Sequence, residues 1–122
     1  MAQRIHSPES LDTLARELEV ASGTSIFGTQ AGLAEFLNVH RSQISRVARG
    51  AQALREEQAW RLTALTAVCA ALRHVLDPEA VPAWLRGANG HLGGRRPIDL
   101  LRDGRLAEVM DAVEAERAGV VA

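Results

Sequence analysis

Hydrophobic residues recur with helical spacing along most of the chain. The first series consists of four residues at intervals of one, three or four positions: Leu11, Leu14, Ala15 and Leu18. Before it, Ser7-Pro8-Glu9 is typical of a helix start, because serine caps the helix, proline suits the first turn and glutamate complements the helix dipole. The segment Ser-Gly-Thr-Ser at 22–25 is expected to end this helix.

The middle of the chain carries a wider apolar stripe, which predicts one long helix over residues 55–76. Its members recur at helical intervals: Leu62, Leu65, Val68, Cys69, Leu72 and Leu76. A stripe this broad needs cover on more than one side. We therefore expect a homodimer, in which a second copy of the chain supplies part of that cover.

The last third of the chain predicts shorter helices separated by turns. One helical segment is expected around Trp84, and another begins at Pro97 and closes at Asp103-Gly104. A final amphipathic helix is marked by Leu106, Val109, Met110 and Val113. The terminal sequence AGVVA is apolar and uncharged, and it is expected to be disordered unless a partner covers it.

Composition favours an all-α fold. Apolar residues make up 47% of the 122 residues, whereas aromatic residues make up 3% and tyrosine is missing. Because strands select aromatic and β-branched residues, a core of leucine, valine and alanine favours helices. The net charge of −1 excludes a chain-wide basic surface for nucleic acid, so any such surface must be local.

Several other kinds of site are disfavoured by the sequence. The single cysteine, Cys69, cannot form an internal disulfide, and its apolar neighbours indicate a buried side chain. The four histidines form no i, i+4 pair, so we expect neither a metal site nor a cofactor. No signal peptide or membrane span is recognised, and we expect a cytoplasmic protein. Acids of the last helix are expected to be solvated or to meet a basic rim of a partner: Glu108, Asp111, Glu114 and Glu116.

The segment from Thr29 to Gly50, TQAGLAEFLNVHRSQISRVARG, predicts two short helices that cross at a tight turn. Thr29 caps the first helix and Gly50 ends the second. Ala34 supplies the small residue that the crossing needs, and Asn38 tolerates the positive φ of the turn. The residues expected to pack the two helices together are Leu33, Leu37, Ile44 and Val47.

This segment resembles the helix-turn-helix of the Cro/Xre family, in which a Gln-led helix is followed by Leu-Ala, a turn and Ile-Ser. His40 departs from the serine that commonly caps the second helix in that family, so a weaker cap is expected. The outward face of this helix carries the predicted DNA-binding residues: Arg41, Ser42, Gln43, Ser45, Arg46 and Arg49. Arginine and glutamine can bind base edges through two hydrogen bonds, and serine suits phosphate oxygens. Three arginines and one glutamate give residues 29–50 a net charge of +2, which supplies a local basic patch.

A second motif, WLRGANGHLGGRRPIDLLRDG, spans residues 84–104 and contains five of the ten glycines. Trp84 and Leu85 are expected to anchor a short helix in the core, and Asn89-Gly90 to form a tight turn. Gly93-Gly94 permits backbone conformations that are closed to other residues. A phosphate-binding loop is disfavoured, because no Lys-Ser or Lys-Thr follows the glycines.

This motif, followed by a helix and an apolar end, resembles the C-terminal domain of the Xre–MbcA–ParS antitoxin family. The matching positions are Trp-Leu, Asn, Leu-x-Gly, Pro-x-Asp-Leu-Leu and Gly. An Xre-like helix-turn-helix before this domain is the family's usual layout, so the resemblance covers the chain from about Thr29 to its end. The resemblance implies a type II antitoxin. Its partner would be a RES-domain toxin that consumes NAD by hydrolysis or phosphorolysis, and the antitoxin would block the active site of that toxin.

The resemblance also implies which residues contact the toxin, namely the turn region and the extreme C-terminus. Carried onto this chain, they are Asn89, Leu92, Gly93, Gly94, Arg95, Arg96, Pro97, Asp99, Gly119, Val120, Val121 and Ala122. Relatives often have an aromatic residue in the tail, where this chain has only valines. A looser grip by the tail, or a grip elsewhere, is therefore expected.

Together these patterns predict an all-α protein with two domains. Residues 1–54 would form the helix-turn-helix domain, and residues 55–122 the long connecting helix and the toxin-binding domain. The expected function is a non-enzymatic antitoxin that blocks a RES-domain toxin and represses its own operon by binding operator DNA. The alternative is a stand-alone transcriptional regulator whose C-terminal domain dimerises or senses a signal. An enzyme is disfavoured because no catalytic cluster is recognised.

Overall fold

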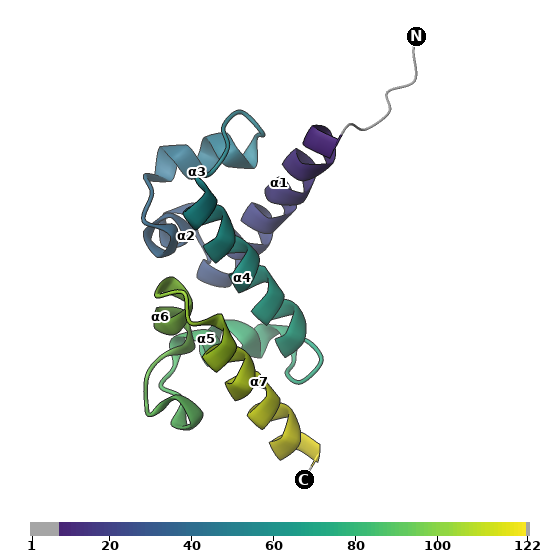
Figure 1. Ribbon diagram of the computed structural model, residues 1–122, viewed down its shortest axis with the longest axis vertical. Helices are drawn as coiled ribbons and strands as arrows, with labels where there is room; N and C mark the ends of the chain where they lie inside the picture. Colours follow the sequence, from purple (N-terminus) through teal and green to yellow (C-terminus); the bar gives the residue numbers. More distant parts are fainter. Residues whose placement is uncertain (1–7, 122) are drawn as a thin grey trace. The chain divides into compact units, whose positions relative to one another are not determined.

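The structure, a computed structural model, describes residues 8–121, with side chains for residues 13–119. Every regular element in that range is helical, so the predicted all-α fold is confirmed. The elements are α1 (Pro8–Phe27), α2 (Gln30–Leu37), α3 (Arg41–Ala48), α4 (Glu56–Leu72), η1 (Pro78–Ala80), α5 (Val81–Arg86), η2 (Gly90–Leu92), α6 (Pro97–Arg102) and α7 (Leu106–Val121) (Figure 1). Within the described residues, none of these helices is both long and apolar enough to cross a membrane.

The chain divides into two compact units. The first unit ends at Gln58 and the second begins at Ala59, so the division falls inside α4. The sequence placed it slightly earlier, after Leu54. Helices α1, α2 and α3 belong to the first unit, and α5, α6 and α7 belong to the second together with most of α4.

In the first unit, α1, α2 and α3 pack against one another in all three pairings. Their core is made of fully buried side chains: Val20, Leu33, Phe36, Leu37, Ile44 and Val47. The rings of Phe27 and Phe36 lie 5.5 Å apart between centroids at an angle of 34°, which closes the core where α1 ends. The packing predicted for the two short helices is therefore present.

Helix α1 differs from its prediction in two ways. It continues through residues 22–25 to Phe27, with Gly23 buried inside it, and the chain turns at Gly28, where φ is +81°. A glycine within a helix costs only about 1 kcal/mol relative to alanine, and tertiary packing can outweigh that cost. The described members of the apolar series, Leu14, Ala15 and Leu18, also face outward, with Leu14 47% exposed and Leu18 63% exposed. The side chain of Leu11 lies outside the described set.

In the second unit, the wide stripe of α4 is covered within a single chain. The helix ends at Leu72 rather than at Leu76, and the buried members of the stripe are Leu62, Leu65, Val68, Cys69 and Leu72. A second copy therefore does not supply their cover. If the protein forms a homodimer, it must use another surface.

The rest of the second unit is built from short helices around α7. Helix α6 packs against both α5 and α7, and η2 packs against α7. Buried side chains from each element form the core: Val81, Leu85, Leu92, Ile98, Leu100, Leu101, Val109, Ala112 and Val113. Helix α7 runs as far as Val121, so the prediction of a disordered end is wrong for residues 119–121. Ala122 lies outside the described residues.

Candidate functional site

The turn between α2 and α3 is held by local capping interactions. The hydroxyl of Thr29 accepts a hydrogen bond from the N–H of Gly32 at 3.0 Å, as expected for the residue that caps α2. Asn38 adopts the left-handed conformation, with φ 58° and ψ 50°. The N–H of Ser42 donates to Nδ1 of His40 at a long 3.4 Å, so His40 does cap α3 but weakly.

The turn fixes which side chains of α3 face outward. Ile44 and Val47 are buried, while the predicted DNA-binding residues lie on the other side of the helix. Five of those six residues, Arg41, Ser42, Ser45, Arg46 and Arg49, line a shallow cavity of about 410 Å³ together with Gln30. We call these six lining residues the recognition surface. The sixth predicted residue, Gln43, is half-buried and is not among them.

The recognition surface is positively charged, because three arginines and no carboxylate line it. Two of the arginines are oriented by neutral partners. Arg46 donates from Nε to Oε1 of Gln52 at 2.6 Å, and Arg49 donates from Nη1 to the hydroxyl of Ser45 at 3.1 Å. Sequence reasoning did not select Gln30 or Gln52. Gln30 was visible as the residue that opens the Gln-led helix, whereas Gln52 has no sequence signal.

In the second unit, Asn89 organises the loop between α5 and α6. Its Oδ1 accepts from the N–H of His91 at 2.9 Å, and its carbonyl accepts from the N–H groups of Leu92 and Gly94. Its own N–H donates to the carbonyl of Arg95 at 3.1 Å, which closes the loop. Asn89 is buried. Asn89 therefore shapes the loop from inside, and its predicted contact with a toxin stays a prediction.

One continuous exposed stretch of this loop consists of Gly93, Gly94, Arg95 and Arg96, which we call the turn surface. Gly93 and Gly94 have φ angles of +67° and +84°, a region that strongly favours glycine. Beneath them, Leu92 and Pro97 are buried. The structure thus separates the predicted toxin-binding residues into an outer layer and an inner support.

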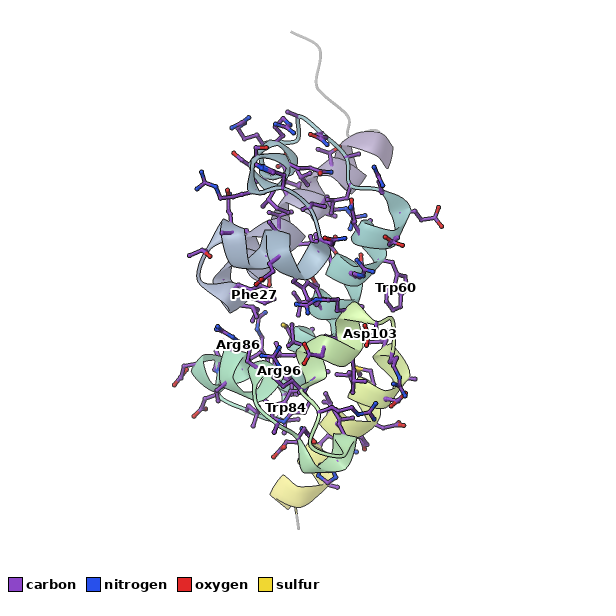
Figure 2. The ribbon with its side chains drawn as sticks, turned by 90° about the vertical axis from the view of Figure 1, so that its left-hand side faces the viewer. Phe27, Trp60, Trp84, Arg86, Arg96 and Asp103 are labelled. Carbon is purple, nitrogen blue, oxygen red and sulfur yellow. The ribbon has the colours of Figure 1, made fainter. Side chains whose placement is uncertain are left out.

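Both arginines of the turn surface are held by carboxylates. Arg96, which is labelled in Figure 2, donates two hydrogen bonds of 2.9 Å to Asp99. Arg102 approaches the same carboxylate at 3.6 Å. The hydrogen bonds from Arg96 hold the pKa of Asp99 below its usual range and raise the pKa of Arg96. Arg95 donates from Nε to the carbonyl of Leu92 at 2.9 Å and lies 3.5 Å from Glu108. These contacts fix the direction of both guanidinium groups.

Helix α7 connects the turn surface to the C-terminal end. Glu108, in its first turn, pairs with Arg95 and Arg105, whereas Glu116 accepts a hydrogen bond of 3.0 Å from the indole N–H of Trp84. Glu108 and Glu116 therefore also hold parts of the motif at residues 84–104, a role that the sequence did not predict for them. Trp84 lies at the half-buried edge of α5 rather than in the core.

A second cavity, of about 450 Å³, lies beside the turn surface within the second unit. It is lined by Ala83, Trp84, Gly87, Ala88, Asn89, Gly90, His91 and Glu116. Asn89, which lines the cavity, is itself a predicted toxin-binding residue, and Glu116 is about one helical turn before Gly119, so the cavity is close to both predicted segments. Gly119 is exposed. The side chains of Val120 and Val121 lie outside the described set, as does Ala122.

Comparison with known proteins identifies the family. The model of the antitoxin Xre/MbcA/ParS C-terminal toxin-binding domain matches residues 71–119. A probable mycobacterial cidal antitoxin from Mycobacterium tuberculosis is 32% identical over 109 residues, which cover 87% of this chain and 91% of that protein. The chain belongs to the Xre/MbcA/ParS antitoxin family. The resemblance drawn from the sequence motifs is therefore confirmed.

A solved structure agrees with this assignment of an Xre/MbcA/ParS antitoxin. The crystal structure of the M. tuberculosis MbcT–MbcA toxin–antitoxin complex contains a chain with a similar fold. The TM-score is 0.72 at 26% identity, and the match covers 85% of this chain and 95% of that one. The segment matched by the toxin-binding domain model, residues 71–119, includes the turn surface, the neighbouring cavity and Gly119.

Proposed function

We propose that this antitoxin neutralises a RES-domain toxin that consumes NAD, by covering the mouth of the toxin's active site. The proposed contacts are the turn surface, the cavity beside it and the end of α7 from Gly119 onward. A toxin partner is supported by the similarity to a chain of the MbcT–MbcA toxin–antitoxin complex. The RES class of toxin and its NAD chemistry rest on the resemblance of the motif at residues 84–104.

The observation that carries this proposal is the preformed shape of the turn surface. Asn89 ties both ends of the loop, two glycines adopt left-handed conformations, and carboxylates orient Arg95 and Arg96. A surface that is already ordered loses little conformational entropy when a partner covers it. The loop therefore suits tight occlusion of a protein cleft.

Co-expression with the adjacent gene tests the proposal. Expression of that gene alone should deplete cellular NAD and stop growth, and co-expression of this chain should restore both. Removal of residues 119–122 should abolish the rescue, while the melting temperature and operator binding of the purified chain stay unchanged. A harmless neighbour, or full rescue by the shortened chain, contradicts the proposed mode of inhibition.

We also propose that the chain represses its own operon through the recognition surface, acting as a helix-turn-helix. The supporting observation is the cavity lined by three arginines and no carboxylate. Arg41, Arg46 and Ser45 are suited to base edges and phosphates, and Gln30 stands where the adjoining helix begins. The stand-alone regulator predicted as an alternative would use this same surface.

Fluorescence anisotropy with the promoter region of the operon tests this second proposal. Specific binding should exceed binding to a scrambled duplex of equal length, because base contacts rather than charge alone discriminate the two. Equal affinity for both duplexes contradicts operator recognition. Rescue from the toxin is measured separately, so that either proposed function can fail without the other.

A further inference from the structure

The cavity beside the turn surface contains a negative charge that no cation of the second unit balances. Glu116 lines this cavity, whereas no lysine or arginine does. Within the described residues, Glu116 accepts a hydrogen bond of 3.0 Å from the indole N–H of Trp84 and forms no ion pair. An indole is neutral, so this contact orients the carboxylate and leaves its charge in place.

Glu116 differs in this respect from other acidic residues of α6 and α7. Three of those carboxylates have an arginine partner three residues away, in the pairs Arg96–Asp99, Arg105–Glu108 and Glu114–Arg117. The residues three and four positions from Glu116 carry no charge, namely Ala112, Val113, Gly119 and Val120. Glu116 is also half-buried, so water screens its charge less than it screens that of an exposed carboxylate. A cation from outside the chain would therefore be attracted to this position.

The shape of the cavity suits a long, flat side chain. Its volume of about 450 Å³ lies within the range of about 300–1,000 Å³ that is usual for ligand clefts. Trp84 lines it with an aromatic ring, and the hydrogen bond to Glu116 places ring and carboxylate next to each other. Much of the remaining lining consists of small residues that leave this space open: Ala83, Gly87, Ala88 and Gly90.

We propose that this cavity receives an arginine side chain of the toxin, whose guanidinium group pairs with Glu116 and packs against Trp84. The inference rests on the proposed neutralisation of a toxin by the second unit. Arginine fits better than lysine, because its guanidinium group is planar, stacks on aromatic rings and can form two parallel hydrogen bonds with a carboxylate. It is also more weakly hydrated than an ammonium group, and it is enriched in protein interfaces.

This contact would add partner specificity to the preformed loop. Asn89 lines the cavity and also ties together the loop that carries the turn surface, so the two regions share one rigid support. The turn surface exposes arginines, whereas the cavity exposes a carboxylate. Neighbouring charges of opposite sign fix the orientation of a partner and disfavour partners with the wrong charge at either position. A toxin without an arginine at the matching position should therefore bind more weakly.

An NMR titration of the full chain with ethylguanidinium chloride tests the cation site without any toxin. The indole N–H signal of Trp84 should shift in a saturable way at millimolar concentrations. The signal of Trp60 should not, because Trp60 is on α4 and does not line the cavity; both residues are labelled in Figure 2. Propylammonium chloride, an analogue of lysine, should shift the Trp84 signal less. Both titrations are run at equal ionic strength and at about pH 8, where histidine is uncharged.

Glu116→Gln removes the charge with little change of shape, because the glutamine oxygen can still accept the indole N–H of Trp84. This variant should lose the saturable shift. It should also bind the purified product of the adjacent gene about tenfold more weakly or worse, since hydrogen bonds to charged groups are the stronger ones. The matched control is Glu114→Gln, which removes the same charge from the same helix at an exposed residue outside the cavity. Its affinity should change by less than about twofold.

Three outcomes overturn the proposal: no saturable shift of the Trp84 signal, an equal response to propylammonium, or equal affinity of Glu116→Gln and the wild type for the toxin. If the wild-type chain rescues cells and Glu116→Gln binds the toxin equally well, this inference fails alone. If the wild-type chain neither binds nor neutralises the product of the adjacent gene, the proposed function fails and takes the toxin arginine with it. The ethylguanidinium titration then still decides whether the cavity binds a guanidinium group.

Discussion

The two units of this antitoxin use arginine in different ways. In the recognition surface, Arg46 and Arg49 are oriented by the neutral side chains of Gln52 and Ser45, so their charge remains available. In the turn surface, Arg95 and Arg96 are each paired with a carboxylate. An arginine with a neutral partner can still neutralise a phosphate, whereas a paired arginine mainly contributes shape and direction. This contrast supports the proposed nucleic-acid role of the first unit and the proposed toxin-binding role of the second.

Charge reversal in each unit should give the largest effects and tests the contrast most directly. Arg46→Glu with Arg49→Glu should weaken operator binding by about 100-fold or more, since each arginine contact to DNA contributes roughly 1–3 kcal/mol. Rescue from the toxin should be unchanged. Arg95→Glu with Arg96→Glu should abolish rescue from the toxin and leave operator binding unchanged. The measurements are anisotropy and cellular NAD, and loss of both activities in either variant contradicts separate surfaces.

Salt concentration should weaken operator binding more than toxin binding, with a smaller effect than charge reversal. Each phosphate contact contributes about 0.9 to the slope of log affinity against log salt, so three arginines predict a slope of roughly −3 per copy for operator binding. Toxin binding should depend less on salt, because its arginines already have carboxylate partners. Titrations between about 50 and 200 mM salt measure both slopes. Equal slopes would show that pairing does not distinguish the two surfaces.

Two capping residues offer a matched comparison of stability with function. Asn89→Ala and Thr29→Ala each remove a side-chain oxygen that accepts a backbone N–H. Each should cost about 1 kcal/mol, or roughly 4–8 °C in the melting temperature of a domain of this size. Only Asn89→Ala should also weaken toxin binding, because Thr29 is in the first unit. Equal loss of toxin binding in both variants would point to a general effect of instability.

The smallest expected effect is a loss of stability of the second unit at alkaline pH. Burial raises the pKa of the Cys69 thiol from 9.0 to about 11, although the charge of Arg73 lowers it. The thiol therefore ionises in the unfolded chain first, so its contribution to stability is complete below about pH 9 and declines as pH approaches 11. Cys69→Ala should flatten this decline.

Tryptophan fluorescence during denaturation measures this effect in the second unit, because Trp60 and Trp84 both lie after the division at Gln58. The chain contains no tyrosine or lysine, so few other side chains titrate in this range. An equal decline in the Cys69→Ala variant would assign it to another group.

Features set by neighbours in the sequence were predicted well. Thr29, Asn38 and Pro97 mark helix boundaries through hydrogen bonds or backbone angles that involve only the next few residues. The outward face of α3 followed from the same local rules. The side of α1 that faces the core depends on packing between helices, and it was not predicted. The direction of Leu14 and Leu18 depends on which side of α1 packs against α2 and α3, and no local rule contains that information.

The same distinction applies to the candidate sites. By itself, the sequence determined the helical fold class, the two motifs and the family, because these follow from spacing and residue type. Only the tertiary structure decided that Glu108 and Glu116 hold the motif at residues 84–104, that Gln52 orients Arg46, and that Asn89 supports its loop from inside. Each of these contacts depends on where the fold places side chains from different elements, and residue type alone does not specify that placement.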